Sequence, residues 1–347
     1  MVQPYSRRHP VGPLMADYVW ERASMSANER VTFVVPADQP IRIEGCPQLE
    51  RLKPYGDLVL YSGRPATPEE KMERVRDADI ILNTKALISW PGDDLRALPK
   101  LRMITTCSIG TDNIDLATAS KMGIVVSNQP SATADHVAEH ILGMMLAASK
   151  RFPFQTAELR AGRWTRVDNI FLRGKTLGVI GTGNIGSRVA RLASAIGMKV
   201  IAWTHHPSDE RAARLGVRFV ELDDLLRQSD VVSLNVRLSD ETKGMLGEKE
   251  LAMMKQGSLL VNGGRAGLVD TLALVDALNS GHLAGAAIDV FDQEPLPPDN
   301  PILSCEQVVL SPHSGDNTPE GIEALHEGAV DNVIAYLEGR PQNVVTW

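Results

Sequence analysis

The sequence predicts an α/β protein of two doubly wound parallel-sheet domains with a cleft between them. Short runs of valine, isoleucine and leucine, typical of strands that helices cover on both faces, alternate with helical segments along the chain. Two such sets follow one another, at about 31–127 and 150–317. The 347 residues are also enough for two domains, since one domain takes roughly 150 residues.

The first set is expected to hold four strands. Each is a short run of β-branched and aliphatic residues bounded by turn residues. Helical segments at 67–78 and 91–100 separate them and carry N-cap or first-turn signals. The predicted strands are 31–35, 57–61, 79–83 and 101–107.

The second set is expected to hold six strands, and two long helices flank it. At 135–151, apolar residues recur at three- and four-residue spacing, which predicts a helix. Thr318 and Pro319 offer an N-cap and a first-turn proline for a final helix at 318–338. Residues 1–30 show no period, and we predict no structure for them. The predicted strands are 177–181, 199–203, 230–236, 258–262, 284–290 and 308–313.

Composition excludes several classes of function. The net charge of −7 and the pI near 5.7 argue against the basic face that nucleic-acid binding requires. No apolar run approaches the roughly 18 residues of a membrane span, and no apolar segment follows the N-terminal arginines as in a signal peptide. We therefore expect neither a nucleic acid nor a membrane as a partner.

The three cysteines, Cys46, Cys107 and Cys305, are far apart in the sequence. They form no Cys-x-x-Cys pair and no ligand cluster, so no metal site is expected. Their odd number argues against a disulfide framework, and we interpret them as thiols in a reducing compartment. We therefore expect a cytoplasmic protein.

The segment 177–203 predicts a dinucleotide-binding unit of the Rossmann type. A strand runs into a G-x-G-x-x-G motif, a helix follows, and a second strand closes the unit. In such a motif the first glycine permits the tight turn, the second lets the backbone approach a pyrophosphate, and the third allows close helix–strand packing. The residues expected to bind the cofactor here are Gly181, Thr182, Gly183, Asn184, Ile185 and Gly186.

The end of the second strand bears on the choice between NAD and NADP. An acidic residue there binds the ribose hydroxyls and repels a 2′-phosphate. This chain has Thr204, followed by His205 and His206, so the repulsive group is missing at that position. The hydroxyl and the imidazoles can bind a phosphate, with Arg211 or Arg214 as further candidates. NADP is therefore slightly favoured, and NAD stays open.

Three later segments place polar side chains just past predicted strands. Arg265 follows the strand at 258–262, and His313 ends the last strand. Asp289 lies at the end of the strand 284–290, and Glu294 follows that strand. Ligands of parallel sheets bind beyond the carboxyl ends of the strands. These groups are therefore expected at the crevice that holds the dinucleotide.

Together these segments resemble the D-isomer-specific 2-hydroxyacid dehydrogenases, a family that includes glyoxylate/hydroxypyruvate reductases and phosphoglycerate dehydrogenases. The resemblance covers about residues 50–335. It implies an NAD(P)-dependent oxidoreductase that transfers a hydride between nicotinamide C4 and the C2 of a 2-oxo or 2-hydroxy acid. The motifs that carry it are SIGTDNIDL (108–116), VAEH (137–140), GTGNIG (181–186), NGGRAG (262–267), DVFDQEP (289–295) and SPHSG (311–315).

The resemblance implies catalytic roles for three residues. Arg265 would bind the substrate carboxylate with its planar fork and polarise the carbonyl. His313 would donate a proton to the carbonyl oxygen in reduction and accept it back in oxidation. Glu294 would bond to the other imidazole nitrogen, orient the ring and favour its charged form.

The same resemblance implies binding roles elsewhere. Backbone N–H groups in the loop of Ser108, Ile109 and Gly110 would bind the substrate carboxylate, because glycine lets a ligand approach the backbone. Lys85 is the candidate cation of the smaller lobe. The other residues expected near the cofactor are Val236 at the adenosine, Gly263 and Gly264 at the nicotinamide ribose, Asp289 at the carboxamide, and His313.

Alternatives within the resemblance stay open. A nicotinamide-sensing, corepressor-like binding protein has the same fold. The formate branch is disfavoured because it has glutamine where Glu294 stands, and the phosphite branch because it has a lysine in the loop 108–111. The phosphate of phosphoglycerate needs extra cationic side chains in the smaller lobe, and Lys85 stands nearly alone there. No regulatory domain is expected after the final helix. A small uncharged substrate such as glyoxylate or hydroxypyruvate is slightly preferred.

The expected division of the chain follows from these assignments. Residues 1–128 with 318–347 would form a flavodoxin-like substrate domain, and residues 129–317 the Rossmann domain. Ala266, where the family often has glycine, is a departure that can alter the loop around Arg265. The family usually forms homodimers, so we expect one here, with 135–151 close to the interface.

Overall fold

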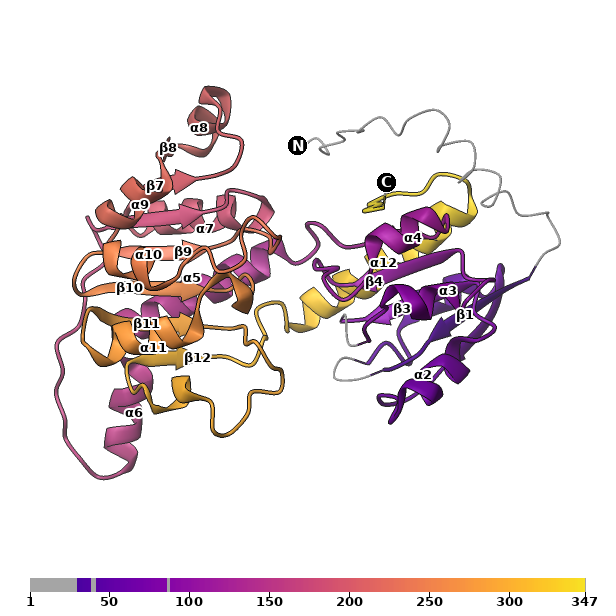
Figure 1. Cartoon of the computed structure of the whole chain (residues 1–347), viewed down its shortest axis with the longest axis horizontal. Coiled ribbons are helices and arrows are strands. Elements are labelled where there is room, and N and C mark those ends of the chain that lie inside the picture. The colour runs from indigo at the N-terminus through magenta and orange to yellow at the C-terminus, as the bar shows by residue number, and fades with distance from the viewer. Residues whose placement is uncertain (1–29, 39–41, 86–87, 347) are drawn as a thin grey trace. The chain divides into compact units, whose positions relative to one another are not determined.

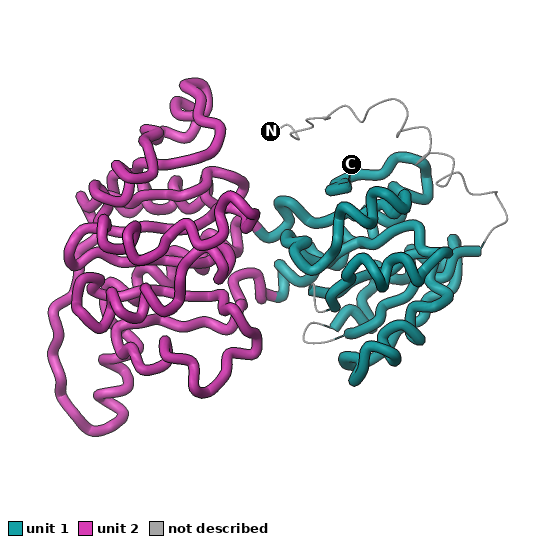
Figure 2. The backbone as a smooth tube through the Cα atoms, in the orientation of Figure 1, with its two compact units in different colours: residues 1–133, 319–347 teal, residues 134–318 magenta. Residues whose placement is uncertain are grey.

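The structure, a computed structural model, describes residues 30–38, 42–85 and 88–346. The chain divides into one unit of residues 1–133 with 319–347 and a second of residues 134–318 (Figure 2). The boundary lies later than residue 128 because Asn128 and Gln129 are hydrogen-bonded to the first unit, as described below. The segment 1–29, for which the sequence predicts no structure, lies outside the described residues.

The first unit contains a parallel sheet of five strands in the order β2-β1-β3-β4-β5. This is the flavodoxin-like order that the sequence predicts. Figure 1 labels three of the strands, β1, β3 and β4. The final strand was missed by the sequence prediction, because three residues are too short to show a period. The strands are β1 Val31–Val35, β2 Gly56–Leu60, β3 Ile80–Thr84, β4 Met103–Cys107 and β5 Val125–Ser127.

Both faces of this sheet are buried, which explains the continuous apolar runs. Phe33 of β1 packs in a core with Leu325 and Val333 of the final helix, and its neighbour Val34 packs in a second core with Val75. Alternate residues of a strand point to opposite faces, so both must be apolar here. The helices of this unit are η1 Pro47–Leu52, α2 Pro68–Val75, α3 Gly92–Arg96, α4 Leu116–Lys121 and α12 Pro319–Leu337.

The C-terminal residues cover the edge of this sheet. Val344 forms an antiparallel bridge with Ser127, and the Val345 N–H donates to the carbonyl of Val126. An edge strand otherwise exposes unpaired backbone groups. The chain after α12 therefore closes the β5 edge.

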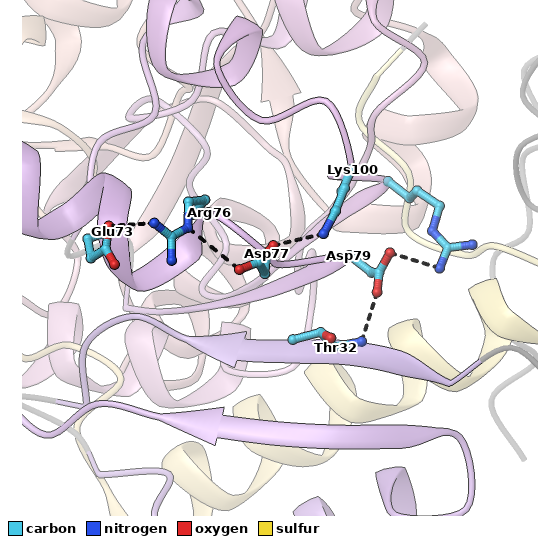
Figure 3. Close-up of polar contacts among 7 residues, drawn as sticks. Thr32, Glu73, Arg76, Asp77, Asp79 and Lys100 are labelled. Carbon is cyan, nitrogen blue, oxygen red and sulfur yellow. Dashed lines mark hydrogen bonds and ion pairs between the residues drawn. The ribbon is translucent and has the colours of Figure 1, made fainter.

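Polar contacts fix the amino-terminal ends of strands in the first sheet. Asp79 accepts the backbone N–H of Thr32 at 2.8 Å and lies 3.1 Å from the guanidinium of Arg102, so it joins the starts of β1, β3 and β4 (Figure 3). An exposed row of ion pairs continues along this end and contributes little, because water screens it. That row consists of Glu73, Arg76, Asp77 and Lys100 (Figure 3).

The second unit contains seven parallel strands in the order β12-β11-β10-β9-β6-β7-β8. The order reverses between β6 and β9, which creates the topological switch point of a Rossmann fold. The strands are β6 Thr176–Ile180, β7 Lys199–Trp203, β8 Arg218–Phe219, β9 Val231–Leu234, β10 Ser258–Asn262, β11 Leu283–Ile288 and β12 Val308–Leu310.

Helices cover both faces of the second sheet (Figure 1). α5 and α7 share one core with Val261, whereas α9, α10 and α11 share the other with its neighbour Leu260. Within the described residues, no helix is long and apolar enough to cross a membrane. The helices are α5 Ala134–Ser149, α6 Phe152–Arg160, α7 Asn184–Ala195, α8 Asp209–Leu215, α9 Leu222–Gln228, α10 Glu248–Met253, η2 Ala266–Leu268, α11 Thr271–Asn279 and η3 Pro301–Ser304.

The helix predicted at 135–151 ends two residues early. α5 stops at Ser149, and Arg151 takes a left-handed conformation with φ 49° before α6 begins. Such a residue cannot continue a right-handed helix. The prediction was wrong there because apolar spacing does not report a backbone reversal.

Candidate active site

The glycine motif forms the turn between β6 and α7. Gly181 has φ 88°, and a Cβ there would lie 2.7 Å from the backbone nitrogen of Val236. A Cβ on Gly186 would lie 1.9 Å from the Gly181 carbonyl oxygen, so α7 passes this turn too closely for any side chain. A Cβ on Gly183 would meet only open space, and this is where a ligand can approach the backbone.

The start of α7 fits a dinucleotide phosphate. Gly183 is the N-cap, and no side chain caps the helix. The hydroxyl of Thr182 is buried and has no hydrogen-bond partner among the described residues. Unpaired donors at a helix N-terminus favour an anion. The motif residues therefore suit the cofactor that the sequence predicts.

The residues after β7 lie at the exposed end of this unit. Thr204 is partly buried, whereas His205 and His206 are exposed. The His205 ring packs edge-on against Trp203 with ring centroids 4.8 Å apart. The Arg211 guanidinium reaches back and donates to the Thr182 carbonyl at 2.5 Å. Arg211 therefore lies against the glycine turn, which the sequence pattern alone leaves undecided.

An acidic side chain also lies here, although none stands at position 204. A carboxylate oxygen of Glu241 is 4.0 Å from the Nδ1 atom of His205. Glu241 is contributed by the loop after β9, about 37 residues along the chain from Thr204 by sequence number. A local sequence pattern therefore misses it.

His313 and Glu294 form a hydrogen-bonded pair. The Nδ1 atom of His313 is 2.8 Å from a carboxylate oxygen of Glu294, and both side chains are partly exposed. The other Glu294 oxygen accepts the Phe291 N–H at 3.0 Å. Partial burial acts to raise the pKa of Glu294, but the bond and charge of His313 outweigh it and hold that pKa below its usual range. The pair leaves Nε2 as the nitrogen that can exchange a proton.

Asp289 fixes the loop that carries His313. Its two carboxylate oxygens accept the N–H groups of Ser314 at 3.0 Å and Gly315 at 3.2 Å. Burial acts to raise the pKa of Asp289, but the nearby His140 imidazole and the hydrogen bond from the Ser314 amide outweigh it, so its pKa is lowered. His140 of α5 lies 3.4 Å away from Asp289. The sequence assigned Asp289 to the cofactor and missed this positioning role.

The Arg265 loop is fixed by a side chain that sequence reasoning overlooked. Asn262, the last residue of β10, donates to the Arg265 carbonyl at 2.9 Å and accepts the Gly264 N–H at 3.1 Å. A Cβ on Gly263 would lie 2.7 Å from the side chain of Ile141, so the loop passes close to α5. The residue after Arg265, Ala266, begins the short helix η2 and is not among the described residues with positive φ.

The strand order places the candidate side chains at the carboxyl-terminal end of the second sheet. β10, β11 and β12 are neighbours in the sheet, and they are followed by Arg265, by Asp289 and Glu294, and by His313. β6 belongs to the same parallel sheet and is followed by the glycine turn, so the turn lies at the same carboxyl-terminal end. The strand order therefore places these residues after the carboxyl ends of strands in one sheet.

The proposed carboxylate loop lies in the first unit, directly after β4. Lys85 follows β3, the strand beside β4, and has φ 49°. Among the described residues, nothing accepts the backbone N–H of Ile109 or of Gly110. These two N–H groups are therefore available for a ligand.

Comparison with known proteins identifies the family. The family model described as D-isomer specific 2-hydroxyacid dehydrogenase, NAD binding domain, matches residues 142–315. A glyoxylate reductase of Aeropyrum pernix is 38% identical over 308 residues, which are 86% of this chain and 92% of that protein. The chain belongs to this family. It is therefore an oxidoreductase of 2-hydroxy acids that uses a nicotinamide cofactor.

Other members of this dehydrogenase family are similar over most of the chain. A D-3-phosphoglycerate dehydrogenase of Methanocaldococcus jannaschii is 37% identical, over 85% of this chain and 56% of that longer protein. The structure of a glyoxylate reductase from Paecilomyes thermophila has TM-score 0.83 and 29% identity, covering 91% of this chain and 98% of that one. An NADPH-dependent glyoxylate/hydroxypyruvate reductase of Sinorhizobium meliloti, in complex with NADP and malonate, has TM-score 0.77 and 29% identity, covering 89% and 94%.

Proposed function

We propose that this dehydrogenase reduces small 2-oxo acids such as glyoxylate and hydroxypyruvate. The observation that carries the proposal is the His313–Glu294 pair at 2.8 Å, at the sheet edge that also carries Arg265 and the glycine turn. The bound dinucleotide would supply the hydride. His313 would then donate its Nε2 proton to the carbonyl oxygen, and Glu294 would stabilise the charged ring before the transfer.

The substrate carboxylate would be bound by two kinds of donor. Arg265 offers a planar guanidinium fork that matches a carboxylate. The N–H groups of Ile109 and Gly110 offer backbone donors of fixed direction, and Ser108 belongs to the same loop. Lys85 would be the additional cation. In this proposal Val236, Gly263, Gly264 and Asp289 lie along the cofactor, as the resemblance implies.

A panel of substrates tests this proposal. Initial rates of NADPH and NADH oxidation would be measured over a range of concentrations of glyoxylate, hydroxypyruvate, pyruvate and phenylpyruvate. Rates of reduction of both oxidised cofactors would be measured over a range of concentrations of 3-phosphoglycerate. We expect the largest kcat/KM with glyoxylate or hydroxypyruvate. A larger value with 3-phosphoglycerate would make the phosphoglycerate dehydrogenase alternative correct. Tight cofactor binding without turnover of any acid would instead favour the corepressor-like sensor.

For the cofactor we propose a preference for NADP. Thr204 stands where an acidic residue would repel a 2′-phosphate, and Arg211, seven residues further along the chain, is a candidate cation for that phosphate. Glu241 opposes this preference. Thr204→Asp is expected to shift the ratio of kcat/KM for NADPH over NADH toward NADH by at least about tenfold. Glu241→Gln serves as the opposite variant and should shift the ratio toward NADPH. An unchanged ratio in both would show that neither side chain faces the ribose.

We also propose a homodimer in the cytoplasm. The support for the dimer is a set of large apolar side chains that are exposed on α6 and the segment after it, which continue from 135–151. Sedimentation of the wild type and of Trp164→Ser would test it, because the loss of a central aromatic weakens an interface. The exposed apolar side chains are Phe152, Leu159, Trp164 and Phe171.

The free thiols support a reducing compartment, which is the basis for proposing the cytoplasm.

A further inference from the structure

The loop of Ser108, Ile109 and Gly110 is fixed by its carbonyl groups. The Ser108 carbonyl accepts the Gln129 N–H at 2.9 Å and the Thr106 hydroxyl at 3.1 Å. The Ile109 carbonyl accepts Nδ2 of Asn128 at 2.7 Å. The Gly110 carbonyl accepts the Ser108 hydroxyl at 2.9 Å. Each of the three carbonyl groups is therefore turned toward the protein.

Peptide planarity converts these bonds into a direction for the N–H groups. In a trans peptide the C=O of one residue and the N–H of the next point in opposite directions. The bonds to the Ser108 carbonyl therefore orient the N–H of Ile109, and the single bond from Asn128 orients the N–H of Gly110. Each N–H group therefore points away from the residues that hold the carbonyl before it, and nothing among the described residues accepts either one.

Asn128 is in turn fixed by two other asparagines, which are distant in the sequence. Nδ2 of Asn332, on α12, donates to the Asn128 carbonyl at 3.0 Å. Oδ1 of Asn332 accepts Nδ2 of Asn343 at 2.9 Å, and the Asn343 carbonyl accepts the Asn128 N–H at 3.2 Å. The three residues, which we call the asparagine ring, form a closed hydrogen-bonded circuit. Asn332 is fully buried, so its amide is committed to this circuit.

The C-terminal segment is shaped to close the ring. Asn343 has φ 53°, a left-handed conformation that asparagine adopts more readily than most residues. The Gln342 carbonyl beside it accepts the Ser127 hydroxyl at 2.9 Å. The segment after α12 therefore contributes a specific amide and also pairs with the β5 edge.

We infer that the asparagine ring positions the carboxylate-binding N–H groups, so that the C-terminal segment helps to set the affinity for the 2-oxo acid. This inference rests on the proposed function of the loop. Asn128, Asn332 and Asn343 are positioning residues, since they act through the Ile109–Gly110 peptide. The amide is required at position 128 because it must donate to a carbonyl, which a carboxylate cannot do.

The test compares KM for the 2-oxo acid with KM for the cofactor. Asn128→Ala and Asn128→Asp both remove the donor to Ile109 and are expected to raise KM for the acid about tenfold, the scale of one lost hydrogen bond. Asn343→Ala should raise it less, about threefold, because it only loosens the ring. KM for the cofactor should change less than twofold, since its proposed residues lie in the other unit. Arg340→Ala, an exposed residue of the same segment paired with Glu338, is the matched control.

Binding of oxamate to the enzyme–cofactor complex provides a second readout that needs no turnover. Its dissociation constant should rise in the same order, with Asn128 variants above Asn343→Ala and the Arg340 control unchanged. Equal rises in acid and cofactor constants would indicate general loosening and would overturn the inference. So would an unchanged acid KM in a folded Asn128→Ala. Failure of the proposed function differs, because the wild type would then neither reduce a 2-oxo acid nor bind oxamate.

Discussion

The two units differ in the candidate ligand-binding groups that they present. In the second unit the candidate groups are charged or titratable side chains, Arg265, Glu294 and His313, each placed just past a strand end. In the first unit they are the backbone N–H groups of Ile109 and Gly110, with Lys85 as the proposed additional cation. Hydride transfer to a carbonyl needs a mobile proton, which a titratable side chain can supply, whereas a carboxylate that does not react needs only fixed donors.

The residues that hold these candidate groups in place also differ in chemical kind between the two units. His313 is fixed by carboxylates, with Glu294 on its ring and Asp289 on the loop that follows it. The backbone N–H groups are fixed by neutral amides, of which Asn128 makes the direct contact. A charged support can change the protonation of the group that it holds, and a neutral support only its position. Substitutions in the two units should therefore separate effects on pH dependence from effects on affinity.

The largest effect is expected from His313→Ala. Loss of the only proposed proton donor should lower kcat for reduction by at least about a hundredfold, the usual scale of general acid–base catalysis. Steady-state assays with saturating cofactor measure it. His282→Ala, at a partly buried histidine of the same unit whose ring contacts Gln256 and the Leu251 carbonyl, is the control. A kcat equal to that of the wild type would remove His313 from the mechanism and with it the contrast between the units.

Arg265→Ala is expected to come next. It removes the bidentate carboxylate contact and the polarisation of the carbonyl, so both KM and kcat should change, with a loss in kcat/KM of about 30-fold or more. Arg265→Lys keeps the charge but not the fork, and should recover only part of the loss. If both variants retain the wild-type kcat/KM for every accepted acid, the carboxylate is bound elsewhere.

Glu294→Gln should mainly change the pH dependence. A neutral amide no longer stabilises the charged imidazole, so the alkaline limb of kcat/KM for reduction should move to lower pH by about one unit. Because the pKa of Glu294 is below its usual range, the wild-type pair should persist when the pH falls to near 4.3, the ordinary value for glutamate. A variant with the same limb and a lower kcat at all pH values would show that Glu294 only orients the ring.

Asp289→Asn is expected to have the smallest effect on catalysis. Its main effect should be on the stability of the fold. The folded pKa of Asp289 is lowered, so its ionised form stabilises the protein fully above the unfolded value of about 3.9 and loses this effect as the pH falls through the folded pKa. Loss of the charged acceptor for two amides should cost about 1–3 kcal/mol at pH 7. Thermal unfolding should show a difference in Tm at pH 7 that shrinks toward pH 3. A difference that is constant with pH would exclude the charge as its cause.

Much of the second unit could be predicted from the sequence because its signals are local or lie at strand ends. Gly181 and Gly186 of the motif meet steric limits that no other residue satisfies, and Arg265 and His313 follow strands with clear apolar runs. β5 and the helix break at Arg151 could not be predicted, since a three-residue strand and one left-handed residue leave no periodic trace.

The sequence by itself therefore determined the fold class, the family and the charged groups, because each depends on residue types within short windows. Only the tertiary structure decided what supports those groups. Asn128, Asn332 and Asn343 are brought together by the return of α12 to the first sheet, and Glu241 is brought to His205 by the strand order of the second. A neutral amide has many possible partners, and only the packed chain selects one.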